Sequence, residues 1–410
     1  MNTFPIDLVR SEFPALNHPA VFLDNPAGTQ VPRPVIEAVA GAMAGAMSNL
    51  NGYFHASREA GAIYARAHEA AAELLGGSSG REIVIGRSMT MLTFHMSRAI
   101  GRSLSPGDEI IVTRMDHEGN VAPWLQLAEE RDLKIRWLPF NRDSCQIEPD
   151  DLKGLLTERT RLLALNYASN LTGSINPVAE LARLAKQAGA LVYVDAVQYV
   201  PHGKVEAAKL GCDFLACSSY KFFGPHLGLL WGREQILTEL QPYAARCAPK
   251  ELPGRHETGA PQTELFAGLV ATVDYLAWLG EQTGATGSRA DKLAHAYQAA
   301  TAYEMPLARQ LIEELGRIPL VQVHGITQAN RMHQRVPTVS LTHPQHRSTV
   351  LARALANEGI NVWSGHNYAL ETTRQLGLDE REGVLRIGLA HYNTADEVER
   401  VLSTLKKLLI

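Results

Sequence analysis

Short apolar runs alternate with amphipathic segments through the first two thirds of the chain. The runs rich in Val, Ile and Leu predict buried strands at 82–86, 108–113, 161–167, 191–196, 213–218 and 228–232. The segments between them predict helices, and the segment at 177–189 begins with proline and ends with glycine, as helices prefer. Strands that alternate with helices predict an α/β fold, with a mainly parallel sheet covered on both faces.

The pattern changes near residue 290. A long helical stretch over 290–317 precedes shorter strand and helix patterns that continue to the end of the chain, among them a helix at 348–359. We predict a large domain over 21–285 and a smaller C-terminal α+β domain over 286–410, with residues 1–20 packed against the smaller one.

Composition and charge exclude several classes of protein. The 410 residues are 45% hydrophobic and 20% charged, as in ordinary globular proteins, and the net charge of −4 argues against nucleic acid or a membrane as partner. The four cysteines form no C-x-x-C pair and no H-E-x-x-H occurs, so neither a metal site nor a disulfide framework is expected. No apolar run approaches the ~18 residues of a membrane span, and the N-terminus lacks a signal-peptide pattern. We predict a soluble, cytoplasmic protein.

Candidate chemistry lies at the ends of two predicted strands. Lys221 follows the apolar run 213–218, and Asp195 lies near the end of the run 191–196. The carboxyl ends of parallel strands share one edge of a sheet, so the two side chains should lie close together. A desolvated lysine forms Schiff bases with aldehydes, and pyridoxal phosphate needs a carboxylate that keeps its ring nitrogen protonated. Taken singly, a surface lysine and a helix-capping aspartate are the ordinary explanations.

Several ordered motifs strengthen the chemical interpretation. The stretches "VYVDAVQYVPH" and "DFLACSSYKFFGPHLGLLWG" resemble the class V aminotransferase group, specifically its cysteine desulfurase-like branch. The resemblance extends over "VFLDNPAGTQVPRPVIEAV" (21–39), "RMDHEGNVAPW" (114–124), "YASNLTGSINPV" (167–178) and "LRIGLAHYNTADEVER" (385–400), and so covers nearly the whole chain. It implies the type I fold of pyridoxal phosphate-dependent transferases, with a sheet of the seven-stranded type, and a homodimer.

The resemblance also implies roles for individual residues. Lys221 would hold the cofactor as a Schiff base, Asp195 would pair with the ring nitrogen, and His117 would stack on the ring or act as acid and base. Gln198 and Asn170 would contact the ring oxygen side, and Arg386 would bind the substrate carboxylate. Further contacts with the phosphate are expected from Met89, Thr90, Ser218 and Tyr220, and with the substrate from His55 and Asn25. Tyr220 stands where the family has histidine, which weakens its assignment.

Two further departures from the family pattern affect the expected assembly and reaction. The segment "RHETGAPQTE" (255–264) resembles one that reaches the neighbouring subunit's cofactor phosphate, but Ala260 replaces its threonine. The stretch "WSGHNYALE" (363–371) resembles the loop that carries the nucleophilic cysteine of desulfurases, but Tyr368 replaces that cysteine and Trp363 replaces an arginine. A phenol cannot hold sulfur as a persulfide, so Tyr368 is expected to shape the substrate pocket or donate a proton.

These residues bear on three classes of function. We predict a pyridoxal phosphate enzyme that acts on an amino acid, foremost a C–S β-lyase without a persulfide cysteine, with an aminotransferase or an epimerase as alternatives. A nicotinamide dehydrogenase is disfavoured because no G-x-G-x-x-G follows a strand. A non-catalytic binding protein that keeps the fold would not need Lys221, Asp195, His117 and Arg386 together.

Overall fold

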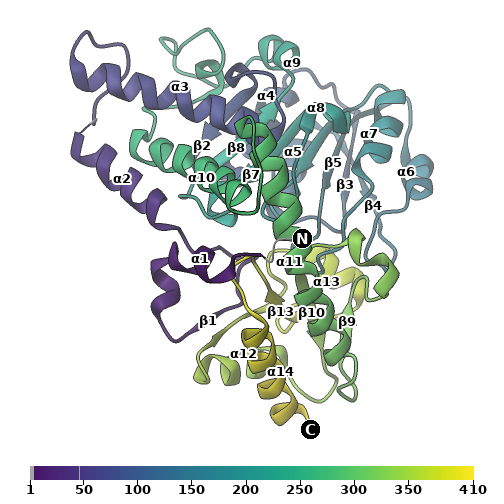
Figure 1. Ribbon diagram of the computed structural model, residues 1–410. Coiled ribbons are helices and arrows are strands. Elements are labelled where there is room, and N and C mark those ends of the chain that lie inside the picture. The colour runs from purple at the N-terminus through teal and green to yellow at the C-terminus, as the bar shows by residue number, and fades with distance from the viewer. Residues whose placement is uncertain (1–3, 46) are drawn as a thin grey trace.

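The computed structural model describes residues 4–45 and 47–410, which form two bodies joined by the long helix α11, Arg289–Leu315 (Figure 1). The larger body contains a seven-stranded sheet in the order β2-β8-β7-β6-β5-β3-β4. Only β8 runs antiparallel to its neighbours, so the sheet is mainly parallel, as predicted. The strands are β2 (Ile83–Gly86), β3 (Glu109–Thr113), β4 (Lys134–Leu138), β5 (Thr160–Asn166), β6 (Leu191–Asp195), β7 (Phe214–Ser218) and β8 (Gly228–Gly232).

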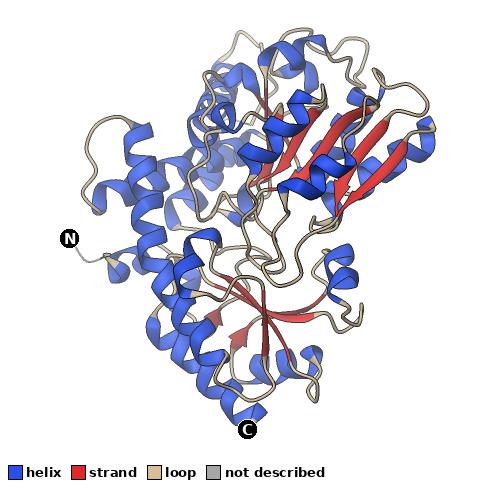
Figure 2. Ribbon diagram, turned by 90° about the vertical axis from the view of Figure 1, so that its right-hand side faces the viewer, coloured by secondary structure: helices blue, strands red, loops and turns tan. Residues whose placement is uncertain are grey.

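Helices cover both faces of this sheet (Figure 2). Successive strand residues point to opposite faces, so Ile111 of β3 packs in one core cluster, and Ile110 and Val112 pack in another. The first cluster includes residues of α2 (Arg33–Gly45), α3 (His55–Leu75), α7 (Val178–Gln187) and α10 (Thr263–Gln282). The second includes residues of α4 (Met89–Gly101) and α5 (Ala122–Arg131). Shorter helices of this body are α6 (Pro149–Leu155), α8 (Ala207–Leu210) and α9 (Glu234–Glu239).

The smaller body has its own apolar core around an antiparallel sheet in the order β12-β13-β10-β9. Its strands are β9 (Gln322–His324), β10 (Thr338–Thr342), β12 (Trp363–Gly365) and β13 (Val384–Gly388), and its helices are α12 (Ser348–Asn357), α13 (Leu370–Leu376) and α14 (Ala395–Leu409). A separate parallel pair joins β1 (Val21–Phe22) to β11 (Ile360–Asn361).

The N-terminal segment contacts both bodies. Helix α1 (Ile6–Ser11) places Val9 in the core of the larger body, where Phe13 also packs. Arg10 instead reaches Glu397 of the smaller body, with 3.0 Å between the charged atoms. Residues 1–3 of this segment lie outside the described part, and the domain limits given above stay a prediction.

The part of the chain that the structure describes contains neither a candidate membrane span nor a candidate metal cluster. None of the helices within them is long and apolar enough to cross a membrane. Across the same residues, no group of three or more His, Cys, Asp or Glu side chains is placed to hold a metal ion.

Candidate active site

A cavity of about 910 Å³ lies where the carboxyl ends of the central strands face the smaller body. The larger body contributes residues that follow β5, β6 and β7, and the smaller body contributes the segment 363–368 and one residue of β13. The cavity brings together all the predicted site residues except His55 and Asn25, namely Met89, Thr90, His117, Asn170, Asp195, Gln198, Ser218, Tyr220, Lys221, Tyr368 and Arg386.

Lys221 ends a short helical turn directly after β7, and its amine points to the chain near residue 26. The amine donates to the backbone carbonyls of Pro26 at 2.6 Å and Ala27 at 2.8 Å. Burial and, to a smaller extent, the charge of Arg386 lower the pKa of Lys221 to about 7, against the opposing effect of Asp195 and Asp24. Near neutral pH a large fraction of this amine is therefore unprotonated and able to act as a nucleophile.

Asp195 is the last residue of β6 and is buried, with 4% of its surface exposed. One carboxylate oxygen accepts a hydrogen bond from the Val197 amide at 2.8 Å. Burial raises the pKa of Asp195 to about 8, and the neighbouring charge of Asp116 contributes to the rise. A cationic group placed against this carboxylate would lower the pKa again, so the site favours a positively charged ligand atom here.

Asp116 is a second buried carboxylate that the sequence interpretation missed. It accepts hydrogen bonds from Asn120 at 2.7 Å and from the Asn166 amide at 3.0 Å, and also from the Thr113 hydroxyl. Burial raises its pKa to about 7. Asp116 directly precedes His117 in the motif "RMDHEGNVAPW", and this position was the available signal in the sequence. The motif does not indicate that the carboxylate is buried.

His117 and Tyr368 come from different bodies and stack on each other. Their ring centroids lie 5.3 Å apart with an angle of 26° between the planes. The His117 Nδ1 accepts from the Gly119 amide at 2.9 Å, and burial lowers the pKa of His117 to about 3, so the ring is neutral. The pair forms one wall of the cavity.

Arg386 and Asn170 form a polar part of the cavity lining. Arg386 donates to the Asn170 carbonyl at 2.8 Å. Two buried atoms of these cavity-lining residues, Arg386 Nε and Asn170 Oδ1, have no hydrogen-bond partner among the described residues. Buried polar atoms without partners are costly, so this pair marks a place where a polar ligand is expected.

The N-terminus of α4 opens onto the same cavity. The Met89 amide donates to the Ser218 hydroxyl at 3.2 Å, which joins the start of α4 to the end of β7. A helix N-terminus with neighbouring hydroxyl groups favours an anion such as phosphate. Tyr220 stacks on His226 with centroids 4.7 Å apart, and its ring lies 4.8 Å from the Lys221 amine.

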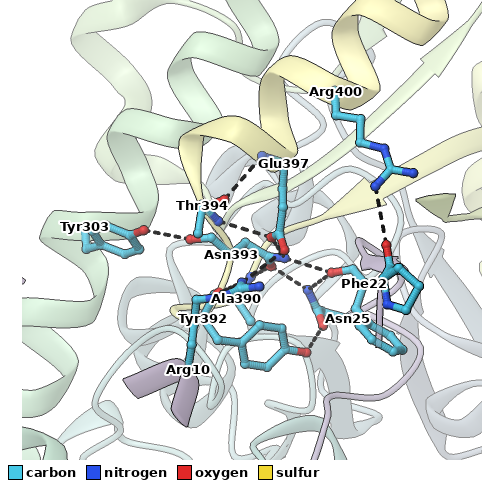
Figure 3. A network of polar contacts seen from close by, with 11 residues as sticks. Arg10, Phe22, Asn25, Tyr303, Ala390, Tyr392, Asn393, Thr394, Glu397 and Arg400 are labelled. Carbon is cyan, nitrogen blue, oxygen red and sulfur yellow. Dashed lines mark hydrogen bonds and ion pairs between the residues drawn. The ribbon is translucent and has the colours of Figure 1, made fainter. Parts of the chain in front are cut away.

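Gln198 lines the cavity and donates to the Thr338 hydroxyl at 2.9 Å. Asn25 instead belongs to a network between the N-terminal segment and the smaller body (Figure 3). Its amide donates to the Gly388 carbonyl at 2.8 Å and to Asn393 at 3.0 Å, and its oxygen accepts from Tyr392. The structure thus gives Asn25 a structural part in this network, and a contact with substrate stays a prediction.

His55 and the segment 255–264 lie away from the Lys221 cavity. His55 begins α3 and lines a shallow groove between α2, α3 and α10. Residues 256–262 line another cavity of about 690 Å³ beside α4. Conversely, His366 lines the Lys221 cavity, although the sequence analysis gave it no role. Its position two residues before Tyr368, inside a recognised motif, was a usable signal.

Comparison with known proteins identifies the class. A family model described as aminotransferase class-V matches residues 21–401. The chain belongs to this family of pyridoxal phosphate-dependent enzymes, which confirms the predicted resemblance, fold class and cofactor.

Individual relatives cover the whole chain. An aminotransferase-like protein of Gibberella zeae is 33% identical over 100% of this chain and 99% of its own length. A cysteine desulfurase of Serratia proteamaculans is 31% identical over 99% of this chain and 98% of its own. Among solved structures, cysteine desulfurases of Thermococcus onnurineus and Escherichia coli superpose with TM-scores of 0.89 and 0.86, each at 26% identity. The first covers 100% of this chain and 99% of its own, and the second 100% of both.

The cavity residues fit pyridoxal phosphate. A buried carboxylate at Asp195 suits a protonated ring nitrogen, and the amine of Lys221 suits an aldehyde. The start of α4 and the Ser218 hydroxyl suit a phosphate group. The neutral ring of His117 offers a flat face, and the unpartnered Asn170 oxygen offers an acceptor.

Proposed function

We propose that the enzyme is a C–S β-lyase that acts on an amino acid without a persulfide cysteine. One observation supports this most strongly: Tyr368 occupies the cavity wall where the resemblance places a cysteine. None of the four cysteines, which all fall within the described ranges, lines the cavity.

The cysteines are also poorly suited to act as nucleophiles. Cys145, Cys212 and Cys217 are buried, and burial raises the pKa of each thiol, to about 11 for Cys145 and about 12 for Cys212. A thiolate is needed to take up sulfur, and these thiols are protonated at neutral pH. Cys247 is exposed in the loop between α9 and α10.

The residues of the cavity have separate parts in the proposed reaction. Bound pyridoxal phosphate supplies an electron sink that weakens the bonds at Cα of an amino acid. Arg386 binds and orients the substrate carboxylate through its unpartnered Nε. The Lys221 amine, with a pKa near 7, takes the proton from Cα, and the Cβ–S bond then breaks so that the thiol leaves. The remaining enamine hydrolyses in water to pyruvate and ammonia.

Tyr368 lies on the cavity wall and would donate the proton that the leaving sulfur needs. The aminotransferase and epimerase alternatives share every step up to the loss of the Cα proton. They differ in the fate of that proton and of the Cβ–S bond.

The test uses the enzyme loaded with cofactor and supplied with L-cysteine or an S-substituted cysteine. Release of pyruvate together with sulfide or a thiol is expected, without a protein-bound persulfide by mass spectrometry. A matched sample whose accessible thiols are alkylated should keep full activity. Persulfide on one cysteine, with loss of activity on alkylation, would restore an ordinary desulfurase. A keto acid that retains its sulfur, or a racemised substrate, would favour the alternatives.

We also propose that the enzyme works as a homodimer. His55 and residues 256–262, which the resemblance assigns to active sites, lie away from the cavity of their own chain. The α2–α3 region exposes large apolar side chains, including Met43 at 60% and Phe54 at 59%. Light scattering after size exclusion should give twice the chain mass, and a fully active monomer would contradict the proposal.

A further inference from the structure

The register of the smaller sheet places an aromatic side chain beside the proposed carboxylate site. Trp363 of β12 pairs directly with Arg386 of β13. Side chains of directly opposed residues lie on the same face, with Cβ atoms about 4.5–5.5 Å apart. Arg386 is 4% exposed, whereas Trp363 is 51% exposed and also lines the cavity. The register therefore places the Trp363 side chain on the same face of the sheet as Arg386, and Trp363 is the more exposed of the two.

A second aromatic ring, that of Tyr368, lies in a segment with an unusual backbone conformation. Asn367 and Tyr368 both have left-handed conformations, with φ of 49° and 59°, which are costly for a side chain as large as tyrosine. Two hydrogen bonds to the larger body hold them there. The Tyr368 carbonyl accepts from the Glu118 amide at 2.8 Å, and the Asn367 carbonyl accepts from Asn170 at 2.8 Å.

The two rings present apolar surface that their own chain leaves uncovered. Tyr368 is 65% exposed even though one face stacks on His117. The neighbouring acidic group at the rim, Glu380, already pairs with Arg374 at 2.6 Å. The cavity of about 910 Å³ also lies near the upper end of the range of about 300–1,000 Å³ in which proteins bind drug-sized ligands. A free cysteine bound at Arg386 carries no group that would cover either ring.

We infer that Trp363 and Tyr368 form a subsite for a planar, apolar side chain of the amino-acid substrate. The inference rests on the proposed function only for the position of the substrate carboxylate at Arg386. In a C–S lyase, this subsite selects a cysteine substrate that carries an aryl or similarly large flat group on sulfur, in preference to free cysteine. A ring stacked on two aromatic side chains gains offset or edge-to-face contacts that a short side chain lacks.

Equilibrium binding of unreactive probes tests the subsite separately from the reaction. 3-Phenylpropionate carries a carboxylate and a ring, whereas propionate carries the carboxylate alone, and neither has an amino group. In titration calorimetry with the cofactor-loaded enzyme, 3-phenylpropionate should bind at least about tenfold more tightly than propionate. Equal affinities for the two probes would overturn the inference.

Variants of Trp363 and Tyr368 test whether their rings cause the preference for 3-phenylpropionate over propionate. Trp363→Ala and Tyr368→Ala should each reduce the ratio of the two affinities by about threefold to tenfold, without a matching loss for propionate. Tyr368→Phe keeps the ring and should keep the ratio. Val350→Ala removes an exposed apolar side chain on α12, outside the cavity, and should change neither affinity. A ratio that survives both alanine variants, or an equal loss for both probes, would refute the subsite.

The two proposals fail in distinguishable ways. If phenylpropionate binds preferentially but no C–S bond is cleaved in any substituted cysteine, the subsite stands and the lyase proposal fails. If pyruvate and sulfide form rapidly from free cysteine and the probes bind equally, the lyase stands and the subsite is refuted.

Discussion

At the scale of single residues, the site combines groups whose charges are disfavoured by burial. The pKa of Lys221 is lowered and that of Asp195 is raised, mainly because both side chains are removed from water. Such opposed shifts are typical of catalytic sites, where they cost stability that the rest of the fold supplies. These two residues were predicted from the sequence because each lies at or just beyond the end of a very apolar strand, where an ionisable side chain is unusual.

Lys221→Met should stabilise the cofactor-free protein, and the gain should depend on pH. Below pH 7 the folded protein buries a protonated amine, whereas the unfolded chain keeps an ordinary pKa of 10.5, so the full cost applies. The cost falls as the pH rises from 7 towards 10.5. Thermal unfolding should therefore show a gain of about 1–3 kcal/mol at pH 6 that shrinks towards pH 10. Turnover should be lost in this variant and in Lys221→Ala, and normal turnover would remove Lys221 from the mechanism.

Asp195→Asn should lower kcat by about 10²-fold or more while weakening cofactor binding much less. The amide has the size of the carboxylate and can keep the hydrogen bond from the Val197 amide, but it cannot favour a protonated ring nitrogen. Stopped-flow kinetics and titration of the cofactor-free protein by absorbance separate the two quantities. Near-normal kcat would mean that Asp195 only supports the fold.

At the scale of elements, the apolar pattern predicted buried strands well and an exposed strand poorly. Six strands of the large sheet were predicted at their observed places, but β4 was missed. Its sequence "KIRWL" is only partly buried because β4 lies at the edge of the sheet, so no continuous apolar run marks it. The apolar pattern also did not predict the direction of β8. This strand is antiparallel to β7 because a short connection reverses the chain between them.

Gly228→Ala should disturb the start of α4 and weaken cofactor binding. A Cβ at Gly228 would lie 2.2 Å from the Ser88 carbonyl carbon and 2.5 Å from the Met89 nitrogen, so the backbone must shift. We expect a loss of about 1–3 kcal/mol in the free energy of unfolding, and a clearly raised Kd for the cofactor. Gly232→Ala in the same strand is the matched control, because its Cβ would meet only the flexible Leu237 side chain. Equal Kd values in the two variants would contradict this role of β8.

At the scale of the whole molecule, the site depends on how the two bodies are held together. Lys221 and Asp195 belong to the larger body, and Trp363 and Arg386 to the smaller one. The apolar pattern alone gives no distance between such segments, and only the family resemblance linked them in advance. The resemblance identified the segment that contains Trp363 and His366 but not their places in the cavity, because the pairing of β12 with β13 and the path of the following loop are features of the folded chain.

Helix α11 crosses between the bodies and contains Pro306, which removes one backbone hydrogen bond within the helix. Its first half packs Leu293 and Tyr297 in the large core, and its second half packs Leu307 and Leu311 in the small core. Between the halves lies Glu304, which is fully buried.

Glu304 pairs with His202 of the larger body at 2.9 Å, and this buried pair should fix the position of the smaller body. Glu304→Ala leaves a buried histidine without its partner and should cost about 3–5 kcal/mol in urea unfolding. The double variant with His202→Ala should cost less than the sum of the single variants. Arg309→Ala breaks only an exposed pair on the same helix and should cost less than about 1 kcal/mol. Because we propose that Arg386 of the smaller body binds the substrate carboxylate, Glu304→Ala should also raise KM. Additive costs with an unchanged KM would show that the pair does not couple the two bodies.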